Sequence, residues 1–193
     1  MADSWKFIAG RICLDFVNTV GGWDRAGNVL RDKLESESDL VAWARRAGVP
    51  VSKAGSTAPS DALVRAKKLR AALHAIFQSV ALGRRTNDRQ LKILQAELST
   101  AQTNERLARS GSGFAFVWDD AKSPADTVLW TIAKSAAELL TSDDLAKIRQ
   151  CGGNECGWLF LDTSRNHSRR WCDMRDCGNL AKVKRFRQRR RQQ

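Results

Sequence analysis

The sequence has no hydrophobic run long enough to cross a bilayer, because charged residues interrupt every apolar stretch within a few positions. Proline is scarce, with 3 residues in 193, and no long polar repeat is present, which argues against extensive disorder. The segment Met1–Lys6 lacks the basic and apolar regions of a secretory signal. We therefore expect a folded, cytoplasmic protein with no membrane partner.

Recognisable catalytic motifs are also missing. The sequence contains no phosphate-binding glycine loop, no dinucleotide-binding fingerprint and no convincing set of catalytic residues. Cys13 lies between two apolar residues and is predicted to be a small core side chain. His74 is predicted to pack inside or lie at the surface beside the apolar stripe of a helix. We therefore predict that the protein is not an enzyme.

Positive charge is abundant and unevenly distributed. The net charge is +12, and residues 151–193 hold 11 Lys and Arg against 4 Asp and Glu. The last fifth of the chain therefore carries more than half of the excess. Such a concentration favours an anionic polymer as the partner, bound through phosphate neutralisation and counterion release.

Apolar periodicity and capping residues predict a mainly helical N-terminal region with a few strands. Helices are expected over Leu34–Ala47, Asp61–Leu82, Asn87–Ala108 and Ser123–Leu140, with a further short helix from Thr141 or Ser142 to near Gln150. Strands are expected over Ile8–Val20 and Phe114–Trp118, which are rich in β-branched and aromatic residues.

Four of the five cysteines form two Cys-x4-Cys pairs separated by fifteen residues: Cys151, Cys156, Cys172 and Cys177. In a protein without an export signal, clustered cysteines are more often metal ligands than disulfides. Neighbouring glycines would let the backbone turn tightly around an ion. Free or redox-active thiols would explain neither the spacing nor the glycines. The pattern therefore predicts one structural zinc ion, because four thiolates leave no open position for a catalytic water.

The segments around the cysteines predict a small zinc finger. Trp158–Asp162 and Ser168–Trp171 are expected to form a β-hairpin, followed by a basic helix after Cys177. Val183 and Phe186 are expected to pack this helix onto the hairpin. The order fits a treble-clef-like or ribbon-like finger, so the predicted fold class is α+β, with a mainly helical N-terminal domain before the finger.

Two stretches resemble known families. The segment CGWLFLDTSRNHSRRWCDMRDCGNLAKVKRFRQRR is similar to the CGNR zinc finger, a bacterial module, and ICLDFVNTV with the helical region after it resembles the ABATE domain that usually precedes that finger. The resemblance implies an ABATE-like domain over residues 1–150, a CGNR-like finger over residues 151–193, the four clustered cysteines as zinc ligands, and a stress-related transcription regulator. One position departs: Leu180 stands where the family motif has arginine, whose contact would be lost or moved to Lys182 or Arg185.

The basic residues of the finger are the predicted nucleic-acid contacts: Arg165, Arg169, Arg170, Arg175, Lys182, Lys184, Arg185, Arg187, Arg189 and Arg190. Arginine suits forked contacts to phosphate and to guanine edges, and a zinc module presenting a basic helix is a common reader of duplex DNA. Duplex DNA is favoured over RNA, because few aromatic residues are available here to stack on bases. RNA binding, docking of an acidic protein and a merely solvated tail remain alternatives.

A small-molecule effector is a further possibility. Asp15, Asn18 and Thr19 form a polar group at the end of an apolar segment and could line a ligand pocket. Alternatively, these side chains satisfy a turn through bonds to the backbone. The sequence indicates no dimer face.

Overall fold

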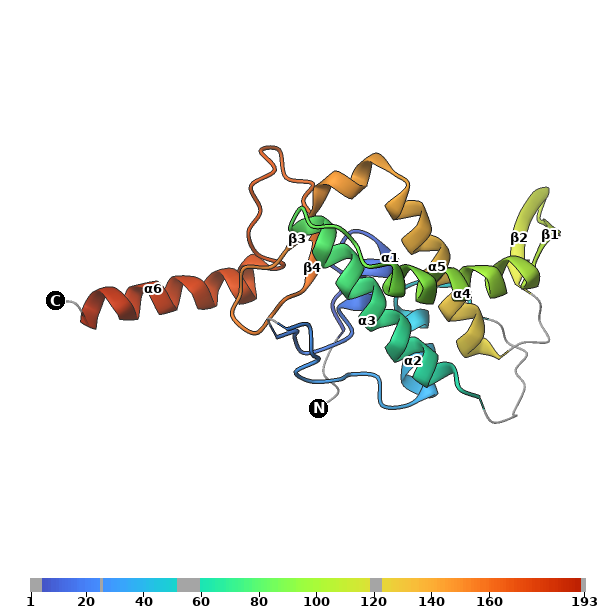
Figure 1. Cartoon of the computed structure of the whole chain (residues 1–193), viewed down its shortest axis with the longest axis horizontal. Coiled ribbons are helices and arrows are strands. Elements are labelled where there is room, and N and C mark those ends of the chain that lie inside the picture. Colours follow the sequence, from blue (N-terminus) through green and yellow to red (C-terminus); the bar gives the residue numbers. More distant parts are fainter. Residues whose placement is uncertain (1–4, 25, 52–59, 119–122, 192–193) are drawn as a thin grey trace.

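A helical body carries two projections at opposite ends, a β-hairpin and the last helix (Figure 1). The computed structural model describes residues 5–24, 26–51, 60–118 and 123–191. The elements are α1 (Ile12–Val17), α2 (Glu37–Arg46), α3 (Ala62–Ala81), α4 (Asp88–Asn104), β1 (Glu105–Ser110), β2 (Gly113–Trp118), α5 (Pro124–Leu140), the 3₁₀ helix η1 (Asp143–Lys147), β3 (Ile148–Gln150), β4 (Leu159–Leu161), the π-helical turn η2 (Met174–Gly178) and α6 (Asn179–Arg191). The predicted α+β class, with a mainly helical region before a cysteine cluster, is confirmed.

Helix α1 lies where the sequence predicted a strand over Ile8–Val20, so that prediction was wrong. A short apolar run that is buried on all sides fits a helix as well as a strand, and five of the six residues of α1 are buried. The carboxylate of Asp15 accepts hydrogen bonds from the backbone N–H groups of Ile8 and Ala9, each at 3.0 Å. These bonds fold the preceding turn back onto the helix.

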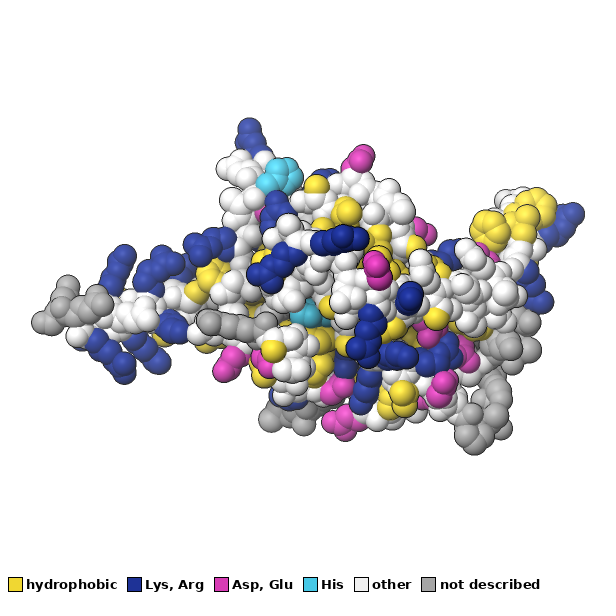
Figure 2. All heavy atoms as spheres, viewed as in Figure 1, with side chains coloured by type: hydrophobic (Ala, Val, Ile, Leu, Met, Phe, Trp, Pro, Cys, Tyr) yellow, Lys and Arg dark blue, Asp and Glu magenta, His cyan; other side chains and the backbone are white. Residues whose placement is uncertain are grey.

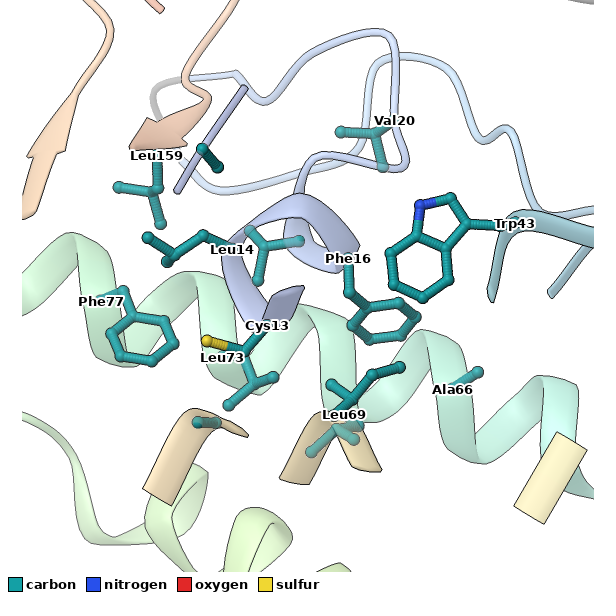
Figure 3. Close-up of a cluster of buried hydrophobic side chains, with 14 of the residues drawn as sticks. Cys13, Leu14, Phe16, Val20, Trp43, Ala66, Leu69, Leu73, Phe77 and Leu159 are labelled. Atoms are coloured by element: carbon teal, nitrogen blue, oxygen red, sulfur yellow. The ribbon is translucent and has the colours of Figure 1, made fainter. Parts of the chain in front are cut away.

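The core forms where α1 packs against α3, α5 and β4 (Figure 3). Phe16 of α1 meets Trp43 of α2 with ring centroids 5.5 Å apart. Cys13 is fully buried, which confirms its predicted place in the core. Burial raises the pKa of the Cys13 thiol to about 12, so this group stays protonated and unreactive at neutral pH.

The helices α2, α3 and α5 confirm three predicted helices, and their caps explain where two of them start. The hydroxyl of Ser36 accepts from the N–H of Asp39 while the Asp39 carboxylate accepts from the N–H of Ser36, which completes a capping box. Ser123 caps α5, with Pro124 in the first turn. None of the helices within the described ranges is long and apolar enough to cross a bilayer.

The hairpin of β1 and β2 corrects the predicted helix over Asn87–Ala108, which ends at Asn104. The strand predicted over Phe114–Trp118 needs a neighbour for its backbone groups, and β1 supplies it in an antiparallel register that pairs Ser110 with Gly113. The turn between them is two residues long.

Two predictions near the cysteines need correction. The short helix expected from Thr141 or Ser142 is present as η1, with Ser142 at its N-cap, but it ends at Lys147 and the residues up to Gln150 form β3. The expected partner of Trp158–Asp162 was Ser168–Trp171, but β4 pairs with β3 instead, with Gln150 opposite Leu159. The reason is burial: β4 lies against the core helices, whereas most residues from 163 to 171 are polar and exposed and gain little from joining a sheet.

Candidate zinc centre and nucleic-acid interface

Four cysteine thiols from two loops converge beside the body. Cys151 and Cys156 belong to the loop between β3 and β4, and Cys172 and Cys177 belong to the segment that leads into α6. All four Sγ atoms lie within 4.8 Å of one another. The Sγ atom of Cys172 is 3.6 Å from that of Cys156 and 3.7 Å from that of Cys177. Residues separated by up to 26 positions therefore share one site.

These distances fit a tetrahedral zinc ion. With Zn–S bonds of about 2.3 Å, the sulfur atoms of a tetrahedral site lie about 3.8 Å apart, close to the two distances above. Four thiolates complete the shell of the ion, so the site is structural and has no position for a reacting water. The four cysteines are positioned to bind one zinc ion, as the spacing predicted.

The first loop is shaped by the strands that flank it. The N–H of Cys151 donates to the carbonyl of Trp158 at 2.8 Å, which extends the β3–β4 ladder to the first ligand. Glu155 and Gly157 both have positive φ, at 59°, so the chain reverses on either side of Cys156. The N–H groups of Gly153 and Cys172 point at the Cys151 sulfur, at 3.4 and 3.3 Å. Such bonds favour the thiolate that a metal requires.

The crowding of the thiols explains why the site needs a cation. The pKa of Cys151 is lowered, because the thiols of Cys156 and Cys172 donate to its sulfur. The pKa values of Cys156 and Cys172 are raised, because each lies beside the Cys151 sulfur and is buried. Without a metal, one thiolate forms readily and the others resist ionisation. A divalent ion removes this conflict, since it compensates several negative charges at once.

The first loop also packs into the core of the body. The indole of Trp158 donates to the carbonyl of Val20 at 3.1 Å, and the N–H of Trp23 donates to the carbonyl of Cys156 at 2.9 Å. The ring of His74 stacks on Trp23 with centroids 3.9 Å apart, and its Nε2 donates to the carbonyl of Gly157 at 3.3 Å. Burial lowers the pKa of His74 to about 4, so this ring is neutral at pH 7. Zinc ligands and N-terminal helices therefore share one core.

The three residues proposed to line an effector pocket are buried and bonded to the backbone. Asp15 accepts from the turn before α1, as described above. Asn18 donates to the carbonyl of Leu159 at 2.8 Å and accepts from its N–H at 3.1 Å, which ties the end of α1 to β4. Thr19 donates to the carbonyl of Phe16 and accepts from Arg70. Each side chain thus has a structural partner, as the alternative interpretation expected, and an effector at this place stays a prediction.

Arg169 differs from the other predicted nucleic-acid contacts because its side chain is held within the finger. Its Nε donates to the carbonyl of Trp171 at 2.9 Å, and its terminal nitrogen donates to the carbonyl of Cys172. The guanidinium lies over the ring of Phe160, 4.3 Å from the centroid. Arg169 therefore holds the second cysteine loop against β4, and its contact with nucleic acid stays a prediction.

The other predicted contacts are exposed, and most of them belong to α6. Arg165, Arg170 and Arg175 lie on the surface of the loop after β4 and of η2. The exposed cations of α6 are Lys182, Lys184, Arg185, Arg187, Arg189, Arg190 and Arg191. The helix contains no acidic residue and none of its residues is buried, and dark blue side chains lie along both of its sides in the space-filling view (Figure 2).

The predicted packing of α6 onto the finger was wrong. Val183 and Phe186 are 39% and 60% exposed. The expected hairpin surface is missing, because residues 168–171 form no strand, so these side chains have nothing to cover. Leu180, which replaces the family arginine, is 70% exposed in the first turn of α6. The first turns of α6 border a pocket together with Gly152 and Trp171, and the rest of the helix extends into solvent.

Lys6 is part of the finger's surroundings that sequence analysis missed. Its ammonium group forms ion pairs with Asp173, at 3.0 Å, and with Asp176. These two acids are the only ones next to the basic segment of the second loop and α6. Because Lys6 pairs with both carboxylates, their negative charges repel a bound polyanion less strongly. No local pattern could reveal the contact, because it joins residues more than 160 positions apart.

Comparison with protein families gives two matches. Residues 10–143 match the ABATE family, described as "Putative stress-induced transcription regulator", and residues 147–190 match the CGNR zinc finger. No curated protein matches the chain. The second match contains all four clustered cysteines and most of α6, and the first covers more than half of the chain. The chain therefore belongs to the ABATE family and carries a C-terminal CGNR zinc finger.

Proposed function

We propose that the protein is a DNA-binding transcription regulator rather than an enzyme, and that zinc holds α6 in position to contact the duplex. The observation that carries the proposal is the character of α6, which has seven cations, no acid and no buried side chain. Its length of 13 residues corresponds to about 20 Å of helix. Such a helix fits the major groove of B-form DNA, and cations on its two sides can reach both phosphate backbones.

The zinc centre gives the helix its direction. Cys177 belongs to η2, which runs directly into α6 at Asn179. Asp173 caps η2 by accepting from the N–H of Arg175 at 2.8 Å. Because the ligand and the first turn of α6 are two residues apart, the ion fixes where the helix leaves the body. This arrangement supports a role for zinc in presenting α6 rather than in chemistry.

Duplex DNA is the favoured form of nucleic acid for a steric reason. The major groove of A-form RNA is deep and narrow, and a helix cannot enter it. Single-stranded RNA is usually bound through exposed aromatic side chains. The exposed side chains of α6 include one aromatic residue, Phe186, among seven cations. This composition favours phosphate contacts over stacking.

The proposal is tested by selecting random duplex DNA on the full-length, zinc-loaded protein and sequencing what is retained. We expect an enriched motif and binding that weakens steeply as salt rises. Competition with duplex RNA of the same length should displace little DNA. Absence of binding to DNA at low salt would overturn the proposal and favour an acidic protein partner, and preferential displacement by RNA would assign the finger to RNA.

A further inference from the structure

The β1–β2 hairpin projects from the end of the molecule opposite α6 and exposes an apolar face (Figures 1 and 2). Leu107, Phe114 and Phe116 are 62%, 66% and 68% exposed. The register sets Leu107 opposite Phe116 and Arg109 opposite Phe114, so all of these side chains share one face. A two-stranded ribbon is only marginally stable by itself. A face of this kind indicates a surface that is covered by a partner.

The two edges of the ribbon differ in charge. Strand β1 carries Glu105, Arg106 and Arg109, whereas β2, with the sequence GFAFVW, carries no charge. Charged side chains on an edge strand oppose pairing with another strand. In an antiparallel pair, every second residue turns its N–H and C=O away from its neighbour. Among the described strands none pairs with the outer edge of β2, and the strand itself carries no charged side chain that would oppose such pairing.

A cavity of about 850 Å³ borders the same strand. Residues 115–118 of β2 form one wall, and residues 10–12 with part of α5 form the other. Lys134 of α5 lies over the rings of Phe116 and Trp118, 5.4 and 5.5 Å from their centroids, and forms an ion pair with Glu105. Phe116, Trp118 and Lys134 therefore line the cavity together, and the side of β2 that faces it is not filled by other side chains.

We propose that this edge pairs with β2 of a second copy of the chain, and that the two hairpins form a four-stranded antiparallel sheet around a two-fold axis. An identical strand suits the edge because neither β2 strand carries a charged residue. The arginines of β1 then lie on the two outer strands, away from the seam. A two-fold axis also needs only one surface patch from each copy.

The alternation of side chains restricts the register of the new sheet. With the axis at Ala115, Phe114 lies opposite the second copy's Phe116, and the reverse pair repeats on the other side of the axis. Both aromatic faces then join into one. A register shifted by one residue would set aromatic side chains opposite those of the other face, which carries Ala115 and Val117. The aromatic face thus favours registers in which the two-fold axis passes through a residue of β2 rather than between two neighbouring residues.

The hairpin and α6 lie at opposite ends of the molecule (Figure 1). A dimer joined through the hairpins is therefore elongated and holds its two basic helices at its far ends. If the proposed DNA-binding function holds, this dimer engages two well-separated stretches of duplex.

The association is tested by analytical ultracentrifugation of the full-length, zinc-loaded protein over a wide range of concentration, without nucleic acid. We expect a monomer–dimer equilibrium. Phe116→Lys should raise the dimer dissociation constant by at least about tenfold, because it places two lysines at the seam. Leu107→Lys is the matched control: it adds the same charge to the same face with similar exposure, but on the outer strand. Circular dichroism and zinc content show whether each variant is folded.

Cross-linking tests the register independently. Ala115→Cys should form a disulfide between copies under mild oxidation with zinc present, whereas Ala108→Cys, its cross-strand neighbour on β1, should not. A wild type that stays monomeric at all concentrations would overturn the proposal, and so would equal effects of Phe116→Lys and Leu107→Lys or cross-linking through Ala108→Cys. Since no nucleic acid is used, failure here leaves the proposed function standing, and failure to bind DNA leaves the dimer standing.

Discussion

Gly22 lies so close to Glu155 that a β-carbon at position 22 would overlap the Glu155 carbonyl oxygen. The next residue, Trp23, donates its N–H to the carbonyl of Cys156. A segment of the N-terminal domain thus touches the backbone of the first cysteine loop at two successive residues. The shape of that loop, and with it the place of two zinc ligands, depends on residues far away in sequence.

Gly22→Ala should therefore damage the zinc centre from a distance. We expect the added methyl group to push the first loop away and to lower the free energy of unfolding by about 1–3 kcal/mol, as overpacking does. Urea unfolding and zinc competition with a chelator measure the two effects. Gly113→Ala is the control, because its nearest neighbour would be 4.0 Å away. Equal losses in both variants would contradict the explanation.

Removal of zinc should loosen the N-terminal domain as well as the finger. The ligand loops belong to the same core as α1, and the free energy of metal binding contributes to folding. We expect hydrogen exchange in α1 to speed up when a strong chelator is added. Helix α4, whose packing partners are α3 and α5, serves as the internal reference. Unchanged protection of α1 after complete zinc loss would show that the finger folds separately.

Asp15 should make stability depend on pH in an unusual direction. Burial raises its pKa from 3.8 to about 6, although the N–H groups of Ala9 and Ile8 oppose this shift. Between these two values the folded state binds the proton more tightly than the unfolded chain, so the contribution of Asp15 to stability falls as pH rises.

Asp15→Asn keeps the oxygen that accepts both hydrogen bonds and removes the charge. It should raise the free energy of unfolding at pH 7 by up to about 3 kcal/mol and have a smaller effect at pH 4. Chemical denaturation of the wild type and the variant at pH 7 and pH 4 measures these two effects. Acid weakens the zinc site in both proteins, so its contribution largely cancels when the variant is compared with the wild type at the same pH. If Asp15→Asn raised the free energy of unfolding equally at both pH values, the charge of Asp15 could not be the cause.

Cations of the finger should separate into two classes when binding to duplex DNA is measured at several salt concentrations. Arg189→Ala should reduce the slope of log affinity against log salt by about one, as expected for one lost phosphate contact. Arg169→Ala should leave the slope unchanged but destabilise the finger, because the carbonyl groups of Trp171 and Cys172 lose a donor. Arg85→Ala, at an exposed position in the loop between α3 and α4, provides a charge-matched control. A reduced slope for Arg169→Ala would show that it does reach phosphate.

Local signals were read correctly from the sequence. The helices α2 and α5 begin close to their predicted starts, because the caps formed by Ser36 and Ser123 involve residues only three positions apart. The cysteine spacing predicted the zinc centre because each pair only has to wrap one side of the ion. In both cases the information lies within a few residues, and the rest of the chain has little influence on it.

Features that depend on distant contacts were missed or misread. The segment at α1 has the composition of a strand, and its burial among helices decides otherwise. Strand β4 pairs with β3 because both strands can reach the core, which no periodicity shows. The partner of Lys6 is likewise set by the fold alone. Each error arose where tertiary packing overrode local preference.

The exposure of α6, which has no buried residue, has a consequence for the strength of binding. An isolated helix of this length is only marginally stable in water, and like charges one turn apart weaken it further. Away from a polyanion, α6 should therefore fray at its C-terminal end, and neutralising its arginines should restore the helical turns. Part of the energy of each phosphate contact is then consumed in ordering the helix. If the proposed DNA binding holds, this cost of ordering should make the affinity moderate and the dissociation fast.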